Sequence, residues 1–173
     1  MQDNIIVKPS VEKQFDRFLR QGRVLFFSAP CGFGKTAVAE ALLSSREVLR
    51  LPADSVGSKL PSAEADWQIL LLDDLQDMQE EQDWNALCEL IRACPERRFV
   101  LLSRGAPPGS LMAFQYTGLM TVLEADDLLF DADDVRRLLL LYGVEAADSE
   151  IDGILKESIG YPLGVAITAR HLS

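Results

Sequence analysis

The sequence predicts an α/β fold: a mostly parallel five-stranded sheet flanked by helices, followed by a small helical subdomain. Up to about residue 125, short apolar runs alternate with segments of helical periodicity, and only helical patterns follow. The 173 residues are 48% hydrophobic, which is enough for a substantial core. We therefore expect a first domain at residues 1–125 and a helical, lid-like subdomain at residues 126–173.

Five short apolar segments are the expected strands. The run VLFFS at residues 24–28 is continuous, as is typical of a strand buried on both faces of a parallel sheet. The other expected strands are residues 47–51, 67–74, 98–104 and 119–125. Residues 53–66 are rich in Ser, Pro and Ala and predict a loop.

Helical spacing of apolar residues predicts the helices between these strands, at residues 10–20, 35–45 and 83–93. We expect Val38 and Leu42 to face inward from the second of them. Trp84, Leu87, Cys88 and Ile91 form one stripe on the third.

The last third of the chain predicts three more helices. Asp131 is a good N-cap with Asp134 three residues on, so a helix should begin there and end at Gly143. A second helix is expected at residues 148–159, with Ile159 facing inward and Gly160 ending it. A third is expected at residues 162–172.

Charge and composition exclude some classes of function. The net charge is −10, which argues against a nucleic-acid-binding surface on this chain. No apolar run is long enough to span a bilayer and no signal-peptide pattern is present, so we expect no membrane partner. Three cysteines without metal-ligand spacing indicate free thiols, buried at Cys88 and Cys94, and a cytoplasmic location.

The segment APCGFGKT, from Ala29 to Thr36, matches the Walker A spacing G-x-x-x-x-G-K-[ST] with alanine at the first position. It lies between an expected buried strand and an expected helix. Such a loop turns backbone N–H groups inward around phosphates, and glycines permit this. The predicted nucleotide-binding residues are therefore Ala29, Gly32, Phe33, Gly34, Lys35, Thr36 and Ala37. Lys35 would reach the β- and γ-phosphates, and the Thr36 hydroxyl would bind Mg²⁺.

A second site candidate is the end of the hydrophobic run ILLLDD, which is typical of a Walker B strand. Carboxyl ends of parallel strands line the ligand crevice. Asp73 would hold Mg²⁺ through water, and Asp74 would orient or deprotonate the attacking water. The alternative is an ordinary solvated turn.

Arg104 follows the fourth expected strand. It would contact the γ-phosphate with its planar guanidinium, or it is a surface arginine paired with a carboxylate. The catalytic candidates are thus Lys35, Asp74 and Arg104, and the metal-binding candidates are Thr36 and Asp73.

Four stretches in this order resemble STAND-class P-loop ATPases: APCGFGKT, LLLDDLQD, RFVLLSR and GYPLGVAITA. The similarity is greatest to the nucleotide-binding domain of large ATP-dependent LuxR-type transcriptional activators of the maltose-regulator kind. It covers nearly the whole chain, but the segment between the second and third strands is shorter than is usual in that family.

The resemblance has implications for the site. It implies that the fourth strand lies between the Walker A and Walker B strands, with Arg104 as a γ-phosphate sensor. It places Gly160, Tyr161 and Pro162, within GYPL, where the family's helical subdomain lies against the adenine, and the backbone of residues 5–9 beside the base. Family members usually carry an arginine near Lys8, so this sequence departs from the family pattern at a position expected to flank the base.

The resemblance also implies a function: a Mg-ATP/ADP-binding switch with slow ATP hydrolysis, in which ATP favours an open form and self-association of the full-length protein. Sensor and DNA-binding regions would lie outside this chain. Two alternatives remain open: a small-molecule P-loop kinase, with Arg136 and Arg137 as candidate lid arginines, and a nucleotide-binding domain that does not hydrolyse.

Overall fold

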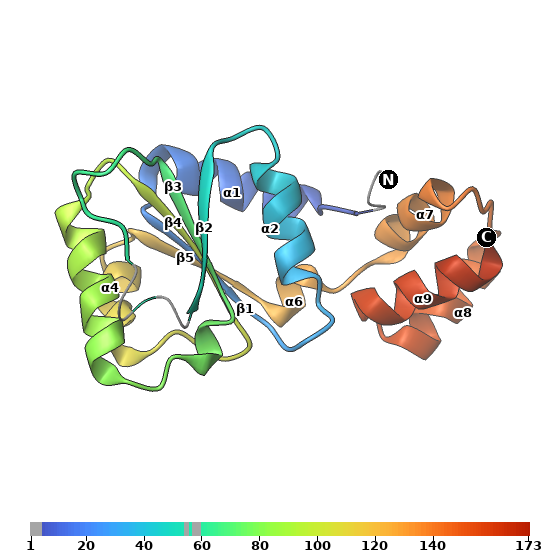
Figure 1. The fold of residues 1–173 in the computed structure, drawn as a ribbon. Coiled ribbons are helices and arrows are strands. Elements are labelled where there is room, and N and C mark those ends of the chain that lie inside the picture. The colour runs from blue at the N-terminus through green and yellow to red at the C-terminus, as the bar shows by residue number, and fades with distance from the viewer. Residues whose placement is uncertain (1–4, 54–55, 57–59) are drawn as a thin grey trace.

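A five-stranded sheet forms the first part of the chain, and three helices beside it form the last part (Figure 1). The computed structural model describes residues 5–53, 56 and 60–173. The strands lie in the order β2-β3-β4-β1-β5, and each neighbouring pair is parallel. They are β1 Val24–Ser28, β2 Val48–Pro52, β3 Ile69–Asp73, β4 Arg98–Ser103 and β5 Met120–Glu124. The predicted fold class is confirmed, including the position of β4 between β1 and β3.

Helices cover both faces of the sheet. Helices α1 (Pro9–Gln21), α2 (Lys35–Leu43) and α6 (Ala125–Leu128) lie on one face. Helices α4 (Glu81–Ala93) and α5 (Met112–Tyr116) lie on the other. Successive β1 residues point to opposite faces, so Phe26 joins the core under α4, whereas Phe27 joins the core under α1 and α2. Burial on both faces explains why β1 is a continuous apolar run.

The three helices of the tail have a core of their own. They are α7 Ala132–Leu141, α8 Asp148–Ser158 and α9 Pro162–Leu172. Asp131 caps α7 through a capping box with Asp134, as predicted. None of the described helices is long and apolar enough to cross a membrane.

The N-terminal segment before α1 packs against this tail. Ile6 belongs to the apolar cluster of the tail helices. The Val7 carbonyl accepts hydrogen bonds from Arg137 at 3.4 Å. Lys8 donates to the Leu129 carbonyl, and its Nζ lies 3.5 Å from the buried carboxylate of Asp134. The segment therefore links α1 to α7.

Some expectations about individual elements are wrong. In α2 the buried residues are Val38, Ala39 and Leu43, whereas Leu42 is only partly buried, because the inward face is rotated by about one residue. Ile159 is 79% exposed because it ends α8 in a left-handed conformation. The sequence did not indicate four short helices, α5, α6, η2 (Leu75–Asp77) and η3 (Gly109–Leu111), which are too short to show a period.

The long loop expected at residues 53–66 is only partly described. Residues 54–55 and 57–59 lie outside the described residues, and residues 60–66 contain no helix or strand. β3 begins at Ile69 rather than residue 67, although Trp67 is buried as a core residue.

The turn between α8 and α9 contains a backbone outlier. Ile159 has φ 54° and Gly160 has φ 71°, so two successive left-handed residues reverse the chain. A left-handed conformation costs an L-residue roughly 1–2 kcal/mol. Ile159→Gly should therefore raise the free energy of unfolding by about 0.5–1 kcal/mol, since the extra entropy of unfolded glycine offsets part of the relieved strain. Urea denaturation measures this change.

Gly160→Ala is the matched control for Ile159→Gly. A Cβ at position 160 would lie 2.5 Å from the Phe130 carbonyl oxygen, so this variant should lose stability. An Ile159→Gly protein less stable than the parent would show that the turn is not strained.

Candidate functional site

The loop between β1 and α2 is shaped by two glycines. Gly32 has φ 82° and Gly34 has φ 78°, a region that other residues rarely adopt. β1 fixes the start of the loop because its first four residues (24–27) are buried, and α2 begins directly after Gly34. The loop therefore leads into the positive end of a helix, the arrangement that binds anions in proteins.

Lys35 lies across this loop. Its ammonium donates to the carbonyls of Ala29, at 2.6 Å, and Pro30, at 3.0 Å. Burial lowers the pKa of Lys35, an effect opposed by the nearby carboxylate of Asp73 and reinforced by Arg104. A partly desolvated cation interacts strongly with an anion that reaches it.

A direct hydrogen bond joins the two predicted metal ligands. The Thr36 hydroxyl donates to Asp73 Oδ2 at 2.9 Å, and Asp73 Oδ1 accepts from the Asp74 N–H at 2.7 Å. Hydroxyl and carboxylate oxygens suit Mg²⁺, which usually takes only one or two protein ligands and completes its shell with phosphate oxygens and water. The donor set therefore fits this ion. The described residues contain no group of three or more His, Cys, Asp or Glu that could hold a metal without such help.

Asp74 and Arg104 form an ion pair at the same edge of the sheet. Arg104 Nη2 lies 3.6 Å from Asp74 Oδ1, and both side chains are more than half exposed, at 57% and 59% respectively. Gln76 bridges them, since its Nε2 donates to Asp74 Oδ1 at 2.8 Å and its Oε1 accepts from the Arg104 N–H at 3.1 Å. Asp74 has φ 57°, a left-handed conformation that Asp tolerates better than most residues.

Arg104 therefore makes the contact that the sequence left as its second alternative, an ion pair with a carboxylate. That carboxylate is the predicted catalytic one. Gln76 was not expected at the site, and nothing in the segment DDLQD distinguishes it from a surface residue.

An apolar cavity of about 240 Å³ adjoins the loop. The loop contributes Gly32, Phe33 and Gly34, and α2 contributes Ala37. Ile5 comes from the N-terminal segment and Pro162 from the start of α9. Pockets for whole drug-sized ligands measure roughly 300–1,000 Å³, so this cavity suits one flat ring system.

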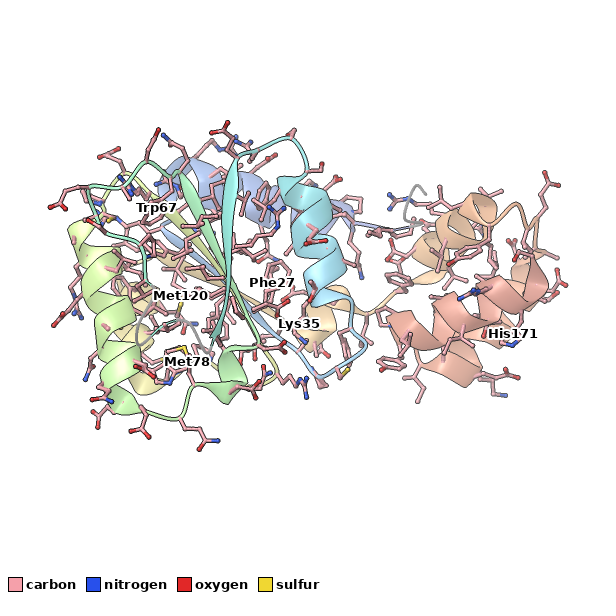
Figure 2. The ribbon with its side chains drawn as sticks, in the orientation of Figure 1. Phe27, Lys35, Trp67, Met78, Met120 and His171 are labelled. Atoms are coloured by element: carbon pink, nitrogen blue, oxygen red, sulfur yellow. The ribbon has the colours of Figure 1, made fainter. Side chains whose placement is uncertain are left out.

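All the predicted site residues lie either at the carboxyl edge of the sheet or in the wall of the adjoining apolar cavity. Lys35, Thr36, Asp73, Asp74 and Arg104 lie at the carboxyl edge of the sheet, where the Ala29 carbonyl contacts Lys35. The others, Gly32, Phe33, Gly34, Ala37 and Pro162, line the cavity. The lone histidine, His171, lies near the end of α9, far from Lys35 (Figure 2).

Sequence reasoning also missed contacts between the tail and the loop. The Tyr161 hydroxyl donates to the Cys31 carbonyl, and the Leu163 N–H donates to the Gly32 carbonyl. Tyr161 stands in the GYPL segment, but no sequence pattern shows that its hydroxyl reaches the loop.

Comparison with known proteins identifies the fold. No protein-family model matches the chain, and no curated protein matches it in sequence. Solved structures are similar: a variant of RuvB from Thermotoga maritima has a TM-score of 0.66 at 16% identity, over 95% of this chain and 61% of that one. A Walker-type ATPase of Pyrococcus abyssi has a TM-score of 0.65 at 10% identity, over 97% of this chain and 67% of that one.

A third similar structure is a Signal Transduction ATPase with Numerous Domains (STAND) from Pyrococcus horikoshii that carries a tetratricopeptide repeat sensor. Its TM-score is 0.62 at 12% identity, over 93% of this chain and 29% of that one. These likenesses show that the chain has a P-loop NTPase-like fold. The chain spans about three fifths of the length of the RuvB structure.

The cysteines offer a test of the loop. Cys31 is exposed in the loop, whereas Cys88 and Cys94 are buried. In the native protein, N-ethylmaleimide should therefore modify Cys31 alone, and pyrophosphate with Mg²⁺ should slow this reaction because the anion would occupy the neighbouring backbone. Peptide mapping by mass spectrometry measures both effects. Native labelling of Cys88 or Cys94, or a rate that pyrophosphate leaves unchanged, would contradict the arrangement described.

Proposed function

We propose that this chain binds ATP and ADP with Mg²⁺ and hydrolyses ATP slowly, as the switch module of a signal-responsive LuxR-type regulator of the STAND class. The observation that carries the proposal is the 2.9 Å hydrogen bond between Thr36 and Asp73, beside the Lys35 ammonium. It joins Thr36, in the first turn of α2, to Asp73, the last residue of β3, and both residues are of the type that Mg²⁺ binds.

The phosphate part of the ligand is supported by the loop. Gly32 and Gly34 allow the backbone to turn around an anion, and Lys35 supplies the cation. Mg²⁺, when bound, would neutralise charge on the phosphate oxygens, with Thr36 as a ligand and Asp73 acting directly or through water.

The base is assigned to the apolar cavity. Its wall has few polar groups, and Pro162 and Ile5 are part of that wall. An apolar slot of this size favours a flat aromatic ring, and the family resemblance of the GYPL segment makes adenine the expected base. Lys8 also lines the cavity, although its ammonium is paired with Asp134.

Slow hydrolysis fits the surroundings of Asp74. Its Oδ1 is shared between Gln76 and Arg104, and aspartate is shorter than the glutamate that many such enzymes use. Asp74 would orient or deprotonate the attacking water, and Arg104 would stabilise negative charge on the γ-phosphate. A site of this kind suits a switch that resets slowly.

The regulatory part of the proposal depends on the resemblance of four sequence segments to STAND regulators and on the similar fold of a STAND protein. In this proposal, ATP-dependent self-association is a property of a full-length, cytoplasmic regulator. RuvB is described as a Holliday junction branch migration motor. The net charge of −10 on this chain disfavours a comparable contact with DNA by its own surface.

The kinase alternative receives less support. Arg136 is engaged by Asp133 at 2.9 Å and by Asp148 at 2.8 Å, within the tail. Arg137 is engaged by the Val7 carbonyl and Asp134. Neither arginine is therefore disposed to act as a lid residue on a transferred phosphoryl group. Phosphoryl transfer to a panel of small acceptors would revive that alternative.

The first test of the proposal concerns Lys35. Lys35→Ala removes a charge-assisted contact to phosphate, a loss of roughly 1.5–3 kcal/mol, so ADP and ATP should bind about tenfold to a hundredfold more weakly. Titration calorimetry measures both affinities. Lys13→Ala is the matched control because Lys13 is exposed on α1. Equal affinities for parent and Lys35→Ala would remove the basis of the phosphate site.

A second test separates the two acids. Asp74→Asn should slow ATP turnover much more than it weakens ATP binding, because orienting water matters chiefly in the transition state. Asp73→Asn should instead reduce the Mg²⁺ dependence of binding. Single-turnover phosphate release and titrations with and without Mg²⁺ measure these effects. If the parent binds ATP but shows no turnover, the non-hydrolysing alternative holds.

A further inference from the structure

Two consecutive peptide groups of the loop are hydrogen-bonded to the helical tail. The Tyr161 hydroxyl donates to the Cys31 carbonyl at 3.0 Å. The Leu163 N–H donates to the Gly32 carbonyl at 3.2 Å. Tyr161 is the N-cap residue of α9, and Leu163 lies in the first turn of that helix. The start of α9 therefore holds the middle of the loop.

The loop and the tail fit closely at this contact. A Cβ on Gly32 would lie 1.8 Å from the Tyr161 hydroxyl oxygen and 3.1 Å from Leu163 Cδ2. The rings of Phe33 and Tyr161 pack edge to face with centroids 5.3 Å apart. By contrast, a Cβ on Gly34 would meet nothing within 4 Å. Position 32 therefore requires glycine for two reasons: its left-handed backbone conformation, and the close approach of the tail, which leaves no room for a Cβ.

The geometry of the peptide bond decides what this contact does. The C=O and N–H of a trans peptide point in opposite directions, and no described peptide bond is cis. The carbonyls of Cys31 and Gly32 point to the tail, so the N–H groups of Gly32 and Phe33, in the same two peptides, point away from it. Neither N–H donates to another group in the part of the chain that the structure describes.

We propose that Tyr161 and the Leu163 N–H are positioning groups for phosphate: they hold these two peptides so that the N–H groups of Gly32 and Phe33 are presented to the bound anion. This inference rests on the proposed nucleotide site and adds to it. The tail contributes to binding of the phosphates, not only of the base. By linkage, phosphate binding and docking of the tail stabilise each other to the same degree.

Binding of pyrophosphate distinguishes the positioning of phosphate-binding peptides from a contact with the base, because pyrophosphate has no base. Tyr161→Phe keeps the ring beside Phe33 and removes only the hydroxyl. Losing one neutral hydrogen bond of this kind should weaken binding roughly threefold to tenfold. The factor should be the same for Mg-pyrophosphate and Mg-ADP. Titration calorimetry on the whole chain measures both, and the ligand-free unfolding midpoint shows whether the variant keeps its fold.

Two controls make the result specific. Pro162→Ala should weaken ADP and leave pyrophosphate unchanged, because Pro162 lines the base cavity. Tyr116→Phe should change neither, since Tyr116 is 82% exposed on α5. If the parent binds both ligands and Tyr161→Phe binds them equally well, or loses affinity for ADP alone, the positioning role is wrong and the nucleotide site stands. If the parent binds neither ligand, the proposed function itself fails.

Discussion

The order of the strands is the constraint on which the site depends. β4 lies between β1 and β3, and all three run parallel, so their carboxyl ends meet at one edge of the sheet. The register aligns Ser28 with Ser103, and Asp73 is the last residue of β3, which pairs with β4. The loop after β1, the acids after β3 and Arg104 after β4 are thereby brought together from separate parts of the chain. Burial of the strands on both faces keeps this alignment fixed.

Polar side chains at this edge are paired with one another or with backbone carbonyls. Lys35 contacts loop carbonyls, Thr36 contacts Asp73, and Arg104 contacts Asp74. Such pairing holds each group close to the place where an anion and a cation would bind, which reduces the reorganisation needed on binding. The pairs differ in environment, because the Asp74–Arg104 pair is exposed and screened by solvent, whereas burial lowers the pKa of Lys35.

The tail is held against the core through several contacts outside the loop. The buried carboxylate of Asp134 is paired with Lys8 and Arg137, so it ties the N-terminal segment to α7. The Phe130 N–H donates to the Gly160 carbonyl at 2.8 Å, which joins the connection before α7 to the turn before α9. Removing one partner of a buried ion pair is strongly destabilising, because the other charge is then left buried without compensation. Pro162 and Tyr161 are therefore presented to the loop by a fixed framework.

Local sequence determined the elements and the chemistry of the loop. The apolar run at Val24–Ser28, the cap at Asp131 and the proline at the start of α9 have local physical causes, and these elements lie where they were predicted. The glycines, Lys35 and Thr36 were recognisable because an anion-binding turn requires those residue types at that spacing. The short helices were missed because a single turn shows no period. Ile159 was expected to face inward because helical spacing does not show that the chain leaves α8 there in a left-handed conformation. Only the tertiary structure decided that Gln76 bridges Asp74 and Arg104, that Lys8 pairs with Asp134, and that Tyr161 reaches Cys31. These contacts join residues from different elements, and their geometry depends on how whole helices and strands pack, which no local pattern records.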